Sequence, residues 1–119
     1  MNAFQLAKTA YAPVHAPLRS AQTNEYDAFV KVTSALKQAT AHHDVVRAIH
    51  DNRSLWTLLA ADVADGDNQL PKALRAQIFY LAEFTDQHSR KVLNGKGTTD
   101  ALIDINAAIM GGLRQQREI

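Results

Sequence analysis

The chain has 119 residues with 46% hydrophobic residues and no cysteine, which describes one domain with enough apolar material for a core and argues against low-complexity disorder. The absence of cysteine excludes disulfides, thiolate metal ligands and cysteine nucleophiles. Thirteen basic and twelve acidic residues alternate along the chain to give a formal net charge of +1, which argues against the basic surface of a nucleic-acid-binding protein.

Residues 1–22 are predicted to form a short N-terminal helix and a proline connector. Phe4 and Tyr11 share one face of this helix, which is too short to be stable alone. Pro13 and Pro17 each disfavour helical geometry in the preceding residue, so we expect an extended connector.

Residues 23–114 are predicted to form a bundle of four main helices, followed by a C-terminal tail at 115–119. The first helix begins at Thr23 or Asn24, which are good N-cap types. The second begins at Asp44 as cap and ends at Asp65-Gly66, where glycine can adopt the left-handed conformation. Their buried stripes comprise Tyr26, Phe29, Val30, Thr33 and Leu36, and then Val45, Ile49, Trp56, Leu59 and Val63.

The third and fourth helices show the same 3- and 4-residue spacing of apolar residues. Pro71 is suited to the first position of the third helix, and Asn94-Gly95 to its end. Thr98 or Thr99 caps the fourth. Their stripes comprise Leu74, Ile78, Leu81 and Val92, and then Leu102, Ile105, Ile109 and Leu113. With no strand alternation and no internal repeat, the sequence predicts an all-α fold.

The polar residues form no motif for metal binding or catalysis. Counted from Asp65, a calcium loop needs glycine and glutamate where Leu70 and Ala76 stand, so a helix–helix turn is favoured. The five histidines lack the spacing of a helical zinc pair, and His88 fits a hydrogen-bonded histidine at the core edge. No serine has a base at motif spacing. We expect no enzyme activity, cofactor, metal or small-molecule substrate.

The chain also lacks the signals of membrane insertion and export. No apolar run approaches the roughly 18 residues of a membrane span. The first twenty residues lack the continuous apolar stretch of a signal peptide. We therefore expect a cytoplasmic protein without membrane contact.

Two residue clusters could build the core or bind a partner. In one, Asn52 lies one turn before the only tryptophan, Trp56. We favour Trp56 as a core anchor and Asn52 as a residue that fixes helix register. In the other, Phe79, Tyr80 and Phe84 cannot share one buried stripe, so at least one is exposed or covered by the N-terminal segment.

These clusters and their surroundings resemble the FlaF family of flagellar biosynthesis regulators. The resemblance covers nearly the whole chain. It rests on residues 50–64, on Leu70-Pro71, 78–85 and His88-Ser89, and on 101–106 and Tyr11-Ala12. It implies a cytoplasmic protein of flagellated alphaproteobacteria that is needed for flagellin synthesis and export. It also implies a partner regulator, FlbT, which restrains flagellin translation. The family has no established catalytic residues.

The resemblance leads us to expect a flagellin-binding export chaperone that acts with FlbT. A groove of aromatic and aliphatic side chains can accept an amphipathic end of flagellin, and the N-terminal helix could cover it when no client is present. The candidate partner-binding residues are Phe4, Tyr11, Asn52, Arg53, Trp56, Arg75, Phe79, Tyr80, Phe84 and His88.

Two other functions stay open. One is an RNA-binding regulator of flagellin mRNA, for which the chain lacks basic clusters with interleaved aromatic residues. The other is a structural adaptor that binds FlbT only. Direct binding of nucleic acid is not expected.

Overall fold

The computed structural model describes the backbone of residues 15–118 and the side chains of residues 25–112. Within this range the chain forms four helices and no strand, which confirms the predicted all-α bundle. The helices are α2 (His15–Gln38), α3 (His42–Ala64), α4 (Lys72–Leu93) and α5 (Asp100–Glu118). The predicted N-terminal helix, with Phe4 and Tyr11, lies outside the described residues.

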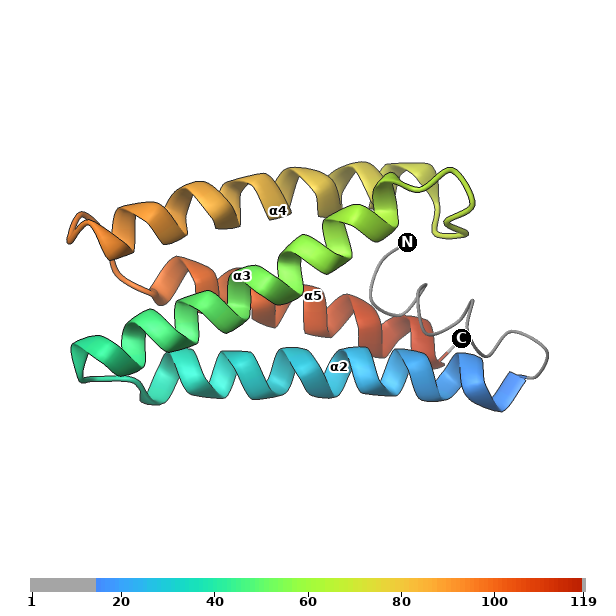
Figure 1. Ribbon diagram of the computed structural model, residues 1–119. Helices are drawn as coiled ribbons and strands as arrows, with labels where there is room; N and C mark the ends of the chain where they lie inside the picture. The colour runs from blue at the N-terminus through green and yellow to red at the C-terminus, as the bar shows by residue number, and fades with distance from the viewer. Residues whose placement is uncertain (1–14, 119) are drawn as a thin grey trace.

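The four helices alternate in direction along the long axis of the molecule (Figure 1). Helix α3 runs obliquely between α2 and α4 and packs against both, while α5 packs against α2 and, less extensively, against α4. Helices α2 and α4 lie diagonally opposite, as do α3 and α5, and neither pair makes close backbone contact within the described residues. Helix α4 is therefore supported mainly by α3.

The core consists of two apolar clusters that match most of the predicted stripes. Phe29 and Trp56 meet edge to face in the larger one, with ring centroids 5.5 Å apart. Val30 is 41% exposed, because it stands one residue and about 100° further round α2 than Phe29. The larger cluster comprises Phe29, Leu55, Trp56, Leu59, Val63, Ile78 and Ile109, and the smaller one Leu36, Ala48, Ile49 and Leu102.

A buried polar network passes through the middle of this core. Asn106 accepts a hydrogen bond from Nε1 of Trp56 at its Oδ1 (2.8 Å). Through Nδ2, Asn106 donates to Oδ1 of Asn52 at 2.7 Å and to Oγ1 of Thr33 at 3.0 Å. These bonds join α2, α3 and α5, so the network favours one register of these helices, the role expected of Asn52.

Helix α2 begins at His15, well before the predicted start at Thr23 or Asn24, so the extended connector expected around Pro17 is wrong from His15 onward. Pro17 stands in the first turn, where backbone N–H groups have no intrahelical partner and a proline removes no hydrogen bond. Helix α5 continues to Glu118, so most of the expected tail at 115–119 is helical.

Two predicted helix termini are also wrong in detail. Ala41, not Asp44, occupies the N-cap of α3, and Asp44 lies in the first turn. At the other end of α3 the C-cap Asp65 is extended, and the only positive φ among the described residues belongs to Gly95 (73°), so Gly66 is not left-handed. Gly95 ends α4 after the C-cap Asn94, as predicted. Pro71 is the N-cap of α4, one residue before its predicted place.

Candidate functional site

A surface hollow of about 460 Å³ lies between α3 and α4. Helix α3 crosses α4 obliquely (Figure 1), and residues of both helices line this hollow. Helix α3 contributes Arg53, Trp56, Thr57 and Ala60, and α4 contributes Phe79, Ala82, Glu83, Thr85, Asp86, Gln87 and Arg90. We call this feature the α3–α4 groove.

The spacing of residues on α4 explains its wall of the groove. Phe79, Glu83, Asp86 and Arg90 follow one another at steps of three or four residues, so they share one face of the helix. Thr85, which belongs to the neighbouring face that packs into the core, is buried. The wall is therefore a half-covered edge of the core, with an aromatic residue at one end and charged residues toward the other.

The structure does not bring the three candidate aromatic residues of α4 together. Their exposed fractions are 43% for Phe79, 66% for Tyr80 and 39% for Phe84, which confirms that at least one is exposed. Only Phe79 lines the groove. Phe84 instead stacks on His88, one turn further along, with ring centroids 5.8 Å apart and planes 6° from parallel.

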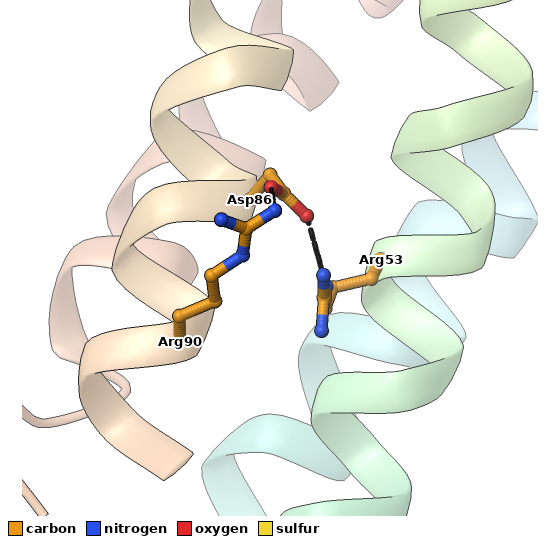
Figure 2. Close-up of polar contacts among 3 residues, drawn as sticks. All are labelled: Arg53, Asp86 and Arg90. Atoms are coloured by element: carbon orange, nitrogen blue, oxygen red, sulfur yellow. Dashed lines mark hydrogen bonds and ion pairs between the residues drawn. The ribbon is translucent and has the colours of Figure 1, made fainter. Parts of the chain in front are cut away.

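Charged residues from both helices meet at one side of the groove (Figure 2). Oδ1 of Asp86 accepts hydrogen bonds from Nε of Arg53 at 3.2 Å and from its Nη2 at 2.5 Å. Oδ2 of the same carboxylate lies 2.8 Å from Nη2 of Arg90, which follows Asp86 by four residues on α4. One carboxylate thus links two guanidinium groups, and the bond to Arg53 ties α3 to α4.

Asn52 and Trp56 belong to the core and not to the exposed surface. Asn52 is fully buried and Trp56 is 1% exposed. Asn106 bonds the indole N–H of Trp56 and Oδ1 of Asn52, and packing covers both side chains. The expectation that these two residues contact a partner from the surface is therefore corrected. Trp56 reaches the groove only as part of its floor.

Arg75, another candidate, closes the end of α3. Its guanidinium donates to the carbonyl of Val63 at 3.0 Å and to the carbonyl of Asp65 at 2.8 Å. The last carbonyls of a helix have no intrahelical partner, so these bonds cap the helix through a side chain. Nothing places Arg75 in the α3–α4 groove.

The turn between α3 and α4 is organised by its own polar side chains. Oδ1 of Asp65 accepts the N–H of Asp67 at 2.8 Å, and this bond lowers the pKa of the Asp65 carboxyl. Oδ1 of Asn68 accepts the N–H of Leu70 at 2.9 Å, while its Nδ2 donates to the carbonyl of Asp62 at 3.1 Å. These contacts are those of a helix–helix turn, the alternative favoured over a calcium loop.

His88 holds the connection between α4 and α5. Its Nε2 lies 2.9 Å from the carbonyl oxygen of Thr98. The ring also lies close to Gly97, where an added Cβ would stand only 3.3 Å from Cε1 of His88. His88 is therefore a hydrogen-bonded histidine at the edge of the core, as favoured from the sequence.

Of the candidates within the described residues, the structure gathers Arg53, Trp56 and Phe79 at the groove and disperses the others. The sequence did not identify Asp86 and Arg90, which complete the charged cluster. Their spacing of four residues was a usable signal, because such a pair shares one helix face. The contact of Asp86 with Arg53 depends on how α3 crosses α4, which cannot be predicted from local spacing.

Two further findings concern the described part of the chain. None of its helices is both long enough and apolar enough to cross a membrane. Within the same residues, no three histidine, aspartate or glutamate side chains come together in a way that could hold a metal ion.

A family model described as "Flagellar protein FlaF" matches residues 7–113, a range that includes α2, α3, α4 and most of α5. No curated protein and no solved structure matches the chain.

Proposed function

This chain belongs to the flagellar protein FlaF family, and we propose that it promotes flagellin synthesis and secretion as a flagellin-binding export chaperone. In this proposal it works in the cytoplasm with FlbT as partner regulator and acts by binding, without catalysis. Family membership supports a flagellar role, and the surface of the protein supports the mode of action.

The observation that carries the proposal is the half-exposed Phe79 at the α3–α4 groove. A side chain with 43% of its surface exposed leaves apolar area open to water beside a floor formed by Trp56 and Ala82. Large aromatic side chains next to a pocket are typical anchors of protein interfaces. The groove is thus suited to burying apolar residues of a partner.

The shape of the groove favours a helical client. Two helices that diverge from a crossing leave a trough in which a third helix can pack its side chains between theirs. A client helix would present apolar residues at positions i, i+3 or i+4 and i+7, the usual pattern of helix-in-groove recognition. Amphipathic helical ends of unassembled flagellin are clients of this kind.

A titration of the purified protein with monomeric flagellin tests the proposal. The wild-type protein should bind flagellin, and Phe79→Asp should weaken the affinity at least about tenfold, because a carboxylate cannot replace the apolar anchor. Val46→Asp is the matched control, since Val46 is 39% exposed on α3 and does not line the groove. It should bind flagellin as the wild type does.

The other outcomes separate the alternatives. Binding to FlbT without binding to flagellin would identify an adaptor and overturn the chaperone proposal. Binding to flagellin mRNA that weakens steeply with added salt would identify an RNA-binding regulator. Equal flagellin affinity for wild type and Phe79→Asp would mean that the groove is not the client surface.

A further inference from the structure

The charged cluster beside the α3–α4 groove holds more positive than negative charge. Arg53 and Arg90 share the single carboxylate of Asp86, so the three side chains together carry a net charge of +1. We propose that the two arginines form a carboxylate clamp, which binds an acidic side chain of the helix that occupies the groove. The inference rests on the proposed function and names the client's chemistry.

The guanidinium groups have donors left for a second carboxylate. Each carries five N–H groups, and the bonds to Asp86 use two from Arg53 and one from Arg90. The side chains are 34% exposed for Arg53 and 66% for Arg90, so an approaching helix can reach them. Arginine pairs with carboxylates through parallel N–H bonds, which gives such contacts direction as well as charge.

Asp86 acts as the internal competitor for this clamp. Its side chain is 40% exposed and pairs with both guanidinium groups, in the arrangement of Figure 2. Without a client, the pairing limits the cost of two adjacent positive charges. When a client binds, the negative charge of Asp86 opposes the client's carboxylate. Asp86 therefore orients the two arginines while it lowers their affinity for the client.

The groove has a polarity that fixes how a client helix lies. Glu83 lines the same wall one turn before Asp86, so negative charge stands nearer the N-terminal end of α4 and the arginines stand nearer its C-terminal end. Phe79, at the apolar end of the wall, precedes Asp86 by seven residues, which is two helical turns or about 10 Å. The client is therefore an amphipathic flagellin helix whose acidic residue lies about two turns from its apolar anchor, on the arginine side.

Flagellin titrations at low ionic strength, with variants on one turn of α4, test the clamp. Arg90→Glu should weaken binding about five- to tenfold, because it removes an attraction and adds a repulsion. Lys91→Glu is the matched control: it makes the same charge change in the same last turn, and Lys91 does not line the groove. It should change the affinity less than about twofold. Arg90→Gln and Lys91→Gln repeat the comparison without charge reversal.

Asp86→Asn gives a prediction of opposite sign. Freeing both arginines from their internal partner should tighten flagellin binding about two- to fivefold and make it more sensitive to salt. Thermal unfolding of each variant checks that the fold is unchanged.

The outcomes distinguish the clamp from the proposed function. If the wild type binds flagellin but Arg90→Glu and Lys91→Glu weaken binding equally, the clamp is overturned and the chaperone proposal stands. If Asp86→Asn weakens binding as much as Arg90→Glu, Asp86 itself contacts the client and the clamp is likewise overturned. If the wild type does not bind flagellin, both proposals fail.

Discussion

The indole Nε1 of Trp56 donates a hydrogen bond to Oδ1 of Asn106 at 2.8 Å, which joins α3 to α5 across the diagonal of the bundle. Backbones of these two helices make no close contact within the described residues, so side chains alone span the distance. Asn106 is fully buried and extends the connection to Asn52 and Thr33. The bundle is therefore held by apolar packing around one polar centre.

Removal of the Asn106 amide should destabilise the protein strongly. Leucine has a similar volume, but Asn106→Leu leaves the indole N–H of Trp56 and the side-chain Oδ1 of Asn52 without their partner in the core. Unsatisfied buried groups cost about 1–3 kcal/mol each, so we expect a loss of roughly 2–4 kcal/mol in the free energy of unfolding by urea denaturation. Asp104→Leu, on an exposed position of the same helix, should cost less than about 0.5 kcal/mol. Equal losses would contradict a special role for the network.

The two aromatic residues Trp56 and Tyr80 should behave in opposite ways when truncated. Trp56 is 1% exposed and packs against Phe29, so Trp56→Ala should cost about 3–5 kcal/mol in the free energy of unfolding. Tyr80 is 66% exposed, and Tyr80→Ala should leave the melting temperature nearly unchanged. Thermal unfolding of both variants checks this. A large loss for Tyr80→Ala would mean that this side chain is covered in solution.

The fold class could be predicted because periodicity is a local property. The stripes through Phe29, Trp56 and Ile78 recur at helical spacing, and all three side chains lie in the larger core cluster. Asn52 stood out as a polar residue within an apolar stripe, and the structure explains it by the bond from Asn106. Nothing in the sequence singled out Asn106 as that partner, because the pairing depends on how α5 lies across α3.

Helix ends and the groove were harder to predict, for two physical reasons. A proline breaks a helix when it lies in the interior but is tolerated in the first turn. Pro17 lies in the first turn of α2, and the local sequence does not determine where that helix begins. The groove depends on the crossing of α3 and α4, which brings Arg53 to Asp86, 33 residues away. Exposure of Phe79 and its separation from Phe84 could be expected, because five residues place the two side chains about 140° apart round the helix. That Phe79, and not Phe84, lines the groove depends on how α3 packs on α4.

Loss of the Arg75 side chain should loosen the end of α3. Arg75→Ala leaves the carbonyls of Val63 and Asp65 without the guanidinium that caps them, and we expect a loss of about 1–3 kcal/mol in the free energy of unfolding. Lys72→Ala, at the exposed start of the same helix, is the control and should cost little. Hydrogen exchange of residues 63–70 should quicken in Arg75→Ala only. Unchanged exchange there would show that the cap does not hold the turn.

A pH titration of stability should reveal the buried carboxyl of Glu25. This side chain is 3% exposed on α2, and its Oε1 has no hydrogen-bond partner among the described residues. Burial raises its pKa from 4.5 to about 8, because the charged form loses its hydration. The folded protein therefore holds this proton more tightly than the unfolded chain. The resulting stabilisation is complete below the pKa that Glu25 has in the unfolded chain. It is lost as the pH rises through the pKa that Glu25 has in the folded protein.

Glu25→Gln keeps the shape of the neutral side chain and removes its titration. The stability of the variant relative to wild type should therefore increase by roughly 1 kcal/mol per pH unit between about pH 5 and pH 8 and then level off. Urea denaturation of both proteins at each pH measures the difference, in which the contributions of all other groups cancel. Parallel stability curves for the two proteins would show that Glu25 is ionised in the folded state or reached by water, since only a carboxyl kept neutral by burial produces this divergence.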